Sequence, residues 1–158
     1  MSKSDIALTL MRELGPLFAP EQIIYYPQHA SWQVVVDADI QIDISHDAER
    51  EQFVFLLDLG PIPAERQHKV YELLLRFSYL WRDSGGLHMA MNDAGNAVLM
   101  FKYPLLGLNV TRLHTLLGNL LNHARRWREL IQHPPQTDED ETERPTAVDL
   151  PPFGGIRV

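Results

Sequence analysis

The chain has 158 residues, of which 45% are hydrophobic and 22% charged, with 21 acidic side chains, 14 basic side chains and no cysteine. This length fits one domain, or one domain with a tail, and the apolar fraction fits a folded core. The lack of cysteine excludes disulfides, thiolate zinc sites and a cysteine nucleophile. The net charge of −7 argues against non-specific binding to nucleic acid or anionic membranes.

We expect neither a signal peptide nor membrane insertion. The apolar stretch 6–14 is interrupted by Thr9, Arg12 and Glu13, and it is too short and too polar for a signal sequence. No run approaches the ~20 apolar residues that a membrane helix needs. The expected location is therefore the cytoplasm.

A first helix is predicted from about Ser4, as the N-cap, to Leu14, with Gly15-Pro16 ending it. Its polar residues form one narrow stripe, so the helix needs burial on more than one side. Three strands are then predicted over 32–36, 40–45 and 52–59. The third is the most continuously apolar and is predicted to be central in the sheet.

A second helix is predicted over about 64–82, and it has two apolar faces. One face holds Val70, Leu73, Leu74, Phe77, Leu80 and Trp81, and the neighbouring face holds Tyr71, Leu75 and Tyr79. A small domain can hardly cover both faces, which indicates a second subunit.

A hairpin over 87–91 and 97–103 follows, turning at 92–96, and a last helix is predicted over 109–132 with Asn109 as its cap. The order is α-β-β-β-α-β-β-α. It predicts an α+β fold in which a twisted, mainly antiparallel sheet is packed by helices, with a homodimer as the assembly.

Composition divides the chain at Pro134-Pro135. Residues 134–158 hold five of the 11 prolines and the acidic run 138–141, and they carry six acids against two arginines. We therefore predict a domain over 1–133 and an acidic, proline-rich, disordered tail over 134–158. The tail ends in an apolar stretch, 150–158, which is either a frayed terminus or a short docking peptide.

No residue pattern predicts catalysis, a cofactor or a metal site. The seven histidines lack ligand spacing, and we expect ordinary surface or hydrogen-bonding roles for them: His29, His46, His68, His88, His114, His123 and His133. Asp37 and Asp39 are typical of a turn, and Asp43 falls at a solvent-facing position. The basic run 125–128 favours a cation cluster at a helix end over a nucleic-acid site.

The order and spacing of these elements resemble those of the class I type III secretion chaperones, the Tir-chaperone-like family of bacteria. The resemblance covers about 4–131 and rests on three sets of segments. These are the strand–turn–strand 34–42 with 53–60, the helix around Leu73-Leu74-Leu75 with Gly85-Gly86-Leu87, and 93–99 with the closing helix to Leu130.

The resemblance implies a cytoplasmic homodimer that binds the N-terminal segment of one or more effectors and keeps it export-competent. It further implies delivery to the secretion apparatus, with the export-gate ATPase as a candidate partner. The implied effector-binding residues are Leu8, Met11, Leu14, Trp32, Val34, Val36, Ile40, Ile42 and Ile44. The implied dimer-interface residues are Val70, Tyr71, Leu74, Leu75, Phe77, Leu87 and Met89.

Two alternatives stay open at this point. One is a regulatory protein–protein interaction domain of the same fold that has no link to secretion. The other is an enzyme that uses His46 or the aspartates Asp37, Asp39 and Asp43.

Overall fold

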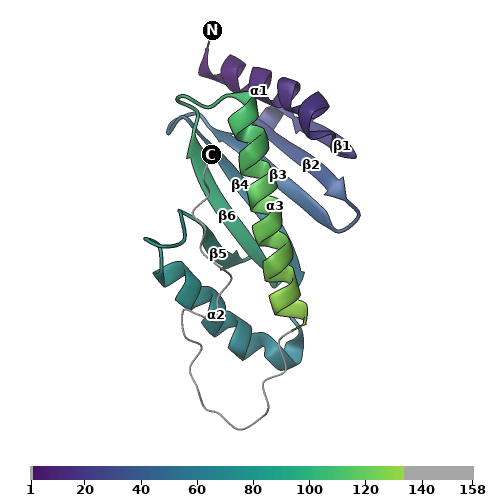
Figure 1. Cartoon of the computed structure of the whole chain (residues 1–158), viewed down its shortest axis with the longest axis vertical. Coiled ribbons are helices and arrows are strands. Elements are labelled where there is room, and N and C mark those ends of the chain that lie inside the picture. Colours follow the sequence, from purple (N-terminus) through teal and green to yellow (C-terminus); the bar gives the residue numbers. More distant parts are fainter. Residues whose placement is uncertain (1, 134–158) are drawn as a thin grey trace.

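The computed structural model describes residues 2–133, which form three α-helices and one six-stranded sheet (Figure 1). The helices are α1 (Lys3–Phe18), α2 (Gln67–Tyr79) and α3 (Val110–Gln132). The strands are β1 (Gln22–Tyr26), β2 (Ser31–Asp37), β3 (Ile40–Asp47), β4 (Gln52–Pro61), β5 (His88–Met91) and β6 (Asn96–Pro104). The expectation for 134–158 lies outside the described residues.

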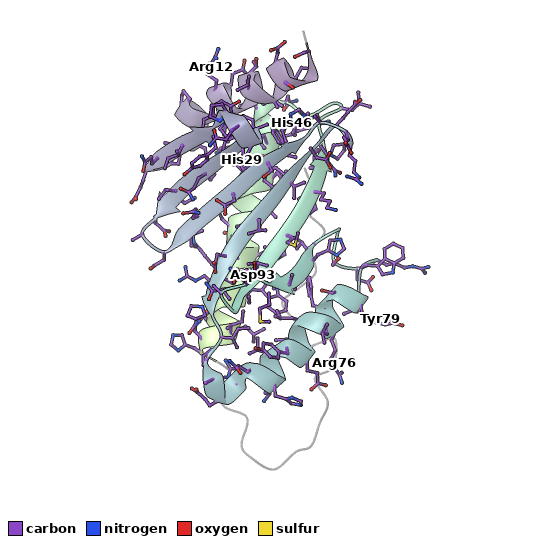
Figure 2. The ribbon with its side chains drawn as sticks, turned by 180° about the vertical axis from the view of Figure 1, so that it is seen from behind. Arg12, His29, His46, Arg76, Tyr79 and Asp93 are labelled. Atoms are coloured by element: carbon purple, nitrogen blue, oxygen red, sulfur yellow. The ribbon has the colours of Figure 1, made fainter. Side chains whose placement is uncertain are left out.

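The sheet is antiparallel throughout, in the order β1-β2-β3-β4-β6-β5. Alternate side chains of a strand point to opposite faces, and β3 and β4 show this as strict alternation of buried and more exposed positions. The buried set faces α1 and α3, which lie across one face of the sheet (Figure 1). From behind, the strands lie in front of α3 (Figure 2).

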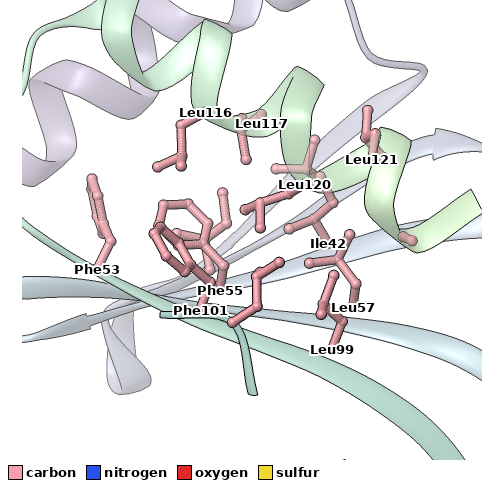
Figure 3. Packing of buried hydrophobic residues seen from close by; sticks show 14 of the residues in the cluster. Ile42, Phe53, Phe55, Leu57, Leu99, Phe101, Leu116, Leu117, Leu120 and Leu121 are labelled. Atoms are coloured by element: carbon pink, nitrogen blue, oxygen red, sulfur yellow. The ribbon is translucent and has the colours of Figure 1, made fainter. Parts of the chain in front are cut away.

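The core lies between α3 and the middle of the sheet (Figure 3). β4 contributes Phe53, Phe55 and Leu57, all fully buried, and Phe53 and Phe55 meet edge to face. α3 contributes two pairs of leucines to the same core, one helical turn apart, namely Leu116 with Leu117 and Leu120 with Leu121. The central place of β4 confirms the prediction made from its apolar run.

The predicted α+β class is confirmed, but one strand was missed. β1 follows α1 as an edge strand, so four strands rather than three precede α2. The Pro27–His29 segment is a 3-10 turn that returns the chain into β2. Asn109 caps α3 as predicted, since its side chain accepts a hydrogen bond from the Arg112 N–H at 2.9 Å.

Both predicted ends of α1 were wrong. Ser2, not Ser4, is the N-cap, and it forms a capping box with Asp5. At the other end the helix continues through Pro16 to Phe18 and stops at Ala19 in the left-handed conformation. Pro16 is tolerated because only the Arg12 carbonyl loses its intrahelical donor, and Arg12 is exposed to water.

The second helix is shorter than predicted. Residues 64–66 form a 3-10 turn, and α2 ends at Tyr79, with Leu80 as its cap. Because the helix stops there, Trp81 does not continue the buried face as expected but is 61% exposed.

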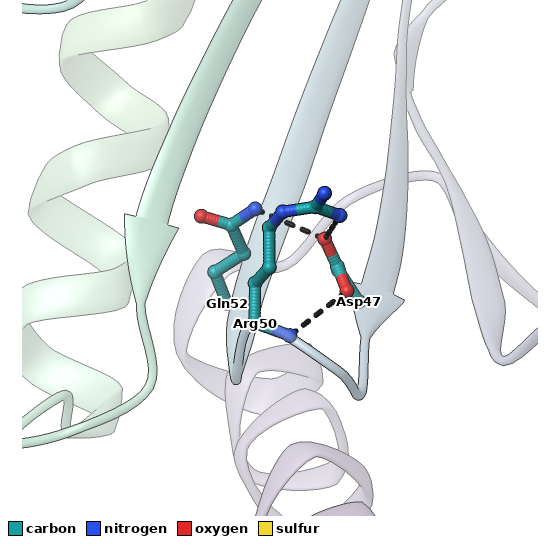
Figure 4. Close-up of polar contacts among 3 residues, drawn as sticks. All are labelled: Asp47, Arg50 and Gln52. Carbon is teal, nitrogen blue, oxygen red and sulfur yellow. Dashed lines mark hydrogen bonds and ion pairs between the residues drawn. The ribbon is translucent and has the colours of Figure 1, made fainter.

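Asp47 organises the β3–β4 turn (Figure 4). Its side chain accepts hydrogen bonds from the Arg50 N–H at 3.1 Å and from the Gln52 side chain at 3.0 Å, and it pairs with the Arg50 guanidinium at 3.3 Å. The Arg50 N–H and then Gln52 lower the pKa of Asp47 below its usual value. A lowered folded-state pKa means that the carboxylate stabilises the fold above about pH 4 and that this contribution is lost as the pH falls further.

Replacing Asp47 with asparagine is expected to destabilise the protein at pH 7, because Asn lacks the charge that strengthens these bonds. Urea unfolding at several pH values gives the free energy of unfolding of both proteins. The difference between Asp47→Asn and wild type should become smaller below pH 4. Asp93→Asn, at an exposed turn aspartate, serves as the control. A gap that stays constant with pH would show that the charge has no role.

Candidate functional site

Exposed apolar side chains gather along the outer face of α2. Leu75 is 73% exposed and Tyr79, one turn later, 83%; Trp81 follows directly after the helix. We call Leu75, Tyr79 and Trp81 the α2 surface. Met91, at the end of the neighbouring β5, is 50% exposed. The opposite face of α2 is inside the protein, where Phe77 meets Trp127 of α3 edge to face at 5.0 Å. The two apolar faces predicted for this helix are therefore one buried face and one exposed face.

The β5 edge of the sheet is closed by α2. The Ser78 hydroxyl donates to the Met89 carbonyl at 3.1 Å and lies 3.3 Å from the Met89 N–H, from which it accepts. Met89 lies on β5, which among residues 2–133 pairs with β6 alone, so the Ser78 side chain satisfies backbone groups that an added strand would otherwise use.

The β1 edge of the sheet is open. β1 pairs with β2 on one side, and within residues 2–133 no strand pairs with its other side. The N–H and C=O groups that point outward from such an edge can pair with an extended chain. The two edges of the sheet therefore differ in what they offer to a partner.

Exposed apolar side chains occur on β1 and in the last turn of α1, the helix that precedes it. Tyr25 is 39% exposed and stacks on Trp32 of β2, with ring centroids 5.0 Å apart. Leu17, in the last turn of α1, is 49% exposed. α1 lies close to β1 at Gly15. A Cβ atom placed on Gly15 would lie 3.7 Å from the Ile23 side chain. We call the outer edge of β1, with Leu17 and Tyr25, the edge surface.

The structure corrects which face of the sheet is exposed. Most of the residues predicted to bind an effector are buried in the core of the same chain, where α1 and α3 pack on the sheet: Met11, Leu14, Trp32, Val34, Ile40, Ile42 and Ile44. Leu8 and Val36 are half-buried. The strand alternation was predicted correctly, but the apolar face is the one covered by the chain's own helices. Whether these residues contact a partner stays a prediction.

The predicted dimer residues divide in a similar way. Five are buried within the single chain: Val70, Leu74, Phe77, Leu87 and Met89. Tyr71 is half-buried, and only Leu75 is exposed. Tyr79, Trp81 and Met91 were not among the predicted interface residues. For Tyr79 the signal was present, because it lies on the second apolar face of the helix.

The residues considered for chemistry have structural surroundings. Asp37 accepts hydrogen bonds from the N–H groups of Asp39 and Ile40 at 2.9 Å each, which confirms the predicted turn. The Asp39 N–H is the main cause of the lowered pKa of Asp37. His46 is buried, contrary to expectation, and its Nε2 has no partner within the described residues. Its ring meets Phe53 edge to face.

The basic run at the end of α3 holds the β2–β3 hairpin. Arg128 donates to the Asp39 carbonyl at 2.6 Å, Arg125 pairs with Asp37 at 3.5 Å, and Trp127 is buried. Among residues 2–133, no group of three or more acidic or histidine side chains could hold a metal ion. No helix in this part of the chain has the length and apolarity needed to cross a membrane.

A family model described as "Tir chaperone protein (CesT) family" matches residues 28–128, which is more than half of the chain. The chain belongs to this family. The match runs from β2 through most of α3. It includes all of α2 and the strands β2 and β6, which lie next to the two edge strands. No match to a curated protein sequence was found.

Solved structures share the fold of this Tir chaperone family member. The ExsC–ExsE complex matches with a TM-score of 0.73 at 18% identity, covering 85% of this chain and all of the other. The HopA1–SchA chaperone–effector complex matches with a TM-score of 0.66 at 20% identity, covering 80% and 95%. The Yersinia pestis type III secretion chaperone SycH, in complex with a fragment of YscM2, matches with a TM-score of 0.55 at 21% identity, covering 75% and 96%.

Ser78→Ala is expected to destabilise the protein by about 1–2 kcal/mol, because it leaves the outward groups of Met89 without their partner. Urea unfolding measures the change in the free energy of unfolding, and hydrogen exchange of the Met89 amide should be faster in the variant than in wild type. Ser45→Ala, at an exposed serine of β3, is the matched control. Unchanged exchange at Met89 would show that Ser78 does not close this edge.

Proposed function

We propose that this chain is a cytoplasmic chaperone of a bacterial type III secretion system. It binds the N-terminal segment of one or more effector proteins, keeps that segment competent for export and promotes its delivery to the secretion apparatus. Membership of the Tir chaperone family supports this function. Further support comes from similar structures that are described as chaperones bound to an effector or to another protein fragment.

The open edge of β1 is the observation that carries the proposal. An extended effector segment adds to β1 as a seventh strand and places alternate side chains against Tyr25, Leu17 and the end of α1. The main-chain hydrogen bonds are independent of sequence, and the apolar contacts accept several side chains. The same surface can therefore serve more than one client.

This function needs no catalytic step, cofactor or metal ion. The chaperone acts by holding a segment extended, so that the segment is neither folded nor aggregated when the secretion apparatus receives it. We propose the export-gate ATPase as the component that receives the complex and supplies the energy for unfolding and release.

We further propose that the chaperone is a homodimer joined through the α2 surface. Three large apolar side chains in a row, each more than half exposed, are unusual for a monomer, and a two-fold axis would pair the surface with itself. Arg82 over the Trp81 ring, at 5.2 Å, and the Arg76–Glu72 pair give this surface a polar rim.

Tyr25→Asp is expected to weaken effector binding at least tenfold, because it removes the ring that stacks on Trp32 and places a charge on the face of β1 where the client's apolar side chains are proposed to pack. The partners are first identified by purifying the tagged full chain from its native host. Calorimetry then measures binding of their N-terminal segments of about 100 residues. Tyr26→Asp is the matched control, since its side chain points to the helix-free face of the same strand. Equal affinities for wild type and Tyr25→Asp would contradict binding at this edge.

Leu75→Asp with Tyr79→Asp is expected to convert the dimer to a monomer, because two charges would face their own copies across the axis. Sedimentation equilibrium at micromolar concentrations measures the mass. Leu106→Asp is the control, at a leucine that is 90% exposed in the β6–α3 loop. A wild-type chain that is monomeric under these conditions would refute the dimer.

A further inference from the structure

The edge surface exposes apolar side chains and unpaired backbone whenever no client is bound. Exposed strand edges of this kind are sites of aggregation, and proteins usually cover them. Within residues 2–133 nothing covers this one, whereas the equivalent groups at β5 are covered by Ser78. Something else must therefore protect the edge between clients.

The chain carries a segment with the chemistry of a client. After a stretch of polar and acidic residues, the sequence ends in Leu-Pro-Pro-Phe-Gly-Gly-Ile-Arg-Val, residues 150–158. Phe153, Ile156 and Val158 are apolar. Phe153, with the two prolines before it, suits the aromatic stack of Tyr25 and Trp32. Arg157 can pair with Glu21, which is exposed and directly precedes β1.

We propose that residues 150–158 occupy the edge surface of the same chain when no client is bound, as a placeholder that a client displaces. This inference rests on the proposed function, because it gives the client site a built-in competitor.

The tail is long enough to reach the surface. It leaves the end of α3, whereas α1 and β1 lie toward the other end of that helix (Figure 1). α3 has 23 residues, which corresponds to about 34 Å. The stretch 134–149 spans up to about 50 Å when extended and averages about 22 Å as a flexible chain. It can therefore bring 150–158 to β1 with only moderate stretching.

The acidic run 138–141 lies within this connecting stretch. Charges of one sign repel one another and stay hydrated, which favours an extended connection over a collapsed one. In the sequence, the apolar segment 150–158 thus follows a hydrophilic connection.

Tethering makes weak binding sufficient. A flexible linker of this length gives an effective concentration of about 1 mM. A segment with an intermolecular Kd of about 0.1 mM would then occupy the surface for about nine-tenths of the time and raise the apparent Kd of a client about tenfold. A client with high affinity for the edge surface still displaces residues 150–158. A client with low affinity does not, so the tail restricts binding to tighter clients.

The test uses the full chain with one cysteine, Ala147→Cys, which carries a nitroxide label. The sequence has no other cysteine, so the label has a single site. We expect paramagnetic broadening of the amide signals of 22–26. This broadening should be lost when Phe153→Asp and Ile156→Asp are added. Val148→Asp, the same kind of change outside the segment, should leave it intact.

Several results of this measurement on the singly labelled chain would each overturn the inference. They are an absence of broadening at β1, broadening that survives the Phe153→Asp and Ile156→Asp changes, and broadening at the α2 surface instead. A mixture of isotope-labelled chain without nitroxide and nitroxide-labelled chain without isotope should show none. Broadening in that mixture would refute docking within one chain.

Client affinity separates this inference from the proposed function. Using the effector segments identified above, Phe153→Asp with Ile156→Asp should tighten binding about tenfold. A client that binds at β1 with unchanged affinity would overturn the placeholder and leave the chaperone function standing. Broadening at β1 together with no effector binding by any variant would overturn the chaperone function alone.

Discussion

The burial of one face of the sheet by α1 and α3 is the constraint on which the rest of the structure depends. The rings of β4 and the leucines of α3 form one continuous core, so every strand must turn its apolar set toward the helices. A one-residue slip of β3, for example, would exchange its buried isoleucines with Gln41, Asp43 and Ser45. Outside this core, the large apolar side chains that remain exposed lie at the end of α1 and on β1, along the far side of α2 with the end of β5, and in the β6–α3 loop.

The two edges of the sheet differ in how their backbone groups are paired, because α2 lies along only one of them. A single serine hydroxyl serves both backbone groups of Met89, which ends the sheet at β5 without another strand. At β1, α1 approaches through Gly15 but covers only part of the strand. The asymmetry leaves unpaired backbone at β1 and exposed apolar side chains beside β5, on the outer face of α2.

Periodicity in the sequence predicted most of the fold, because strand alternation and helical stripes report directly on a one-sided core. β1 was missed, although Ile23-Ile24-Tyr25-Tyr26 is rich in strand-forming residues, because it is short and lies between two prolines. The end of α1 was placed too early, since sequence alone cannot show that the carbonyl left without a donor by Pro16 is solvated. Periodicity also assigned Trp81 to a helix that had already ended.

The site was harder to predict than the fold for a related reason. An apolar strand face looks the same in sequence whether its own helices or a partner cover it, so Trp32, Ile42 and Ile44 were assigned to a partner. Exposure at an edge depends on the order of strands in space, which no local pattern contains. The exposure of Leu75 could be predicted because the surplus of apolar surface on its helix is visible in the sequence without any knowledge of the sheet.

The strand order also determines how many segments one assembly can hold. β1 and the β5 side, where α2 lies, are the two ends of the six-stranded sheet, about 24 Å apart at the usual strand spacing. Subunits joined through α2 would therefore keep both β1 edges free and far from the axis. Such a dimer would have two binding edges. One long polypeptide that engages both β1 edges would gain avidity, whereas a short one would not.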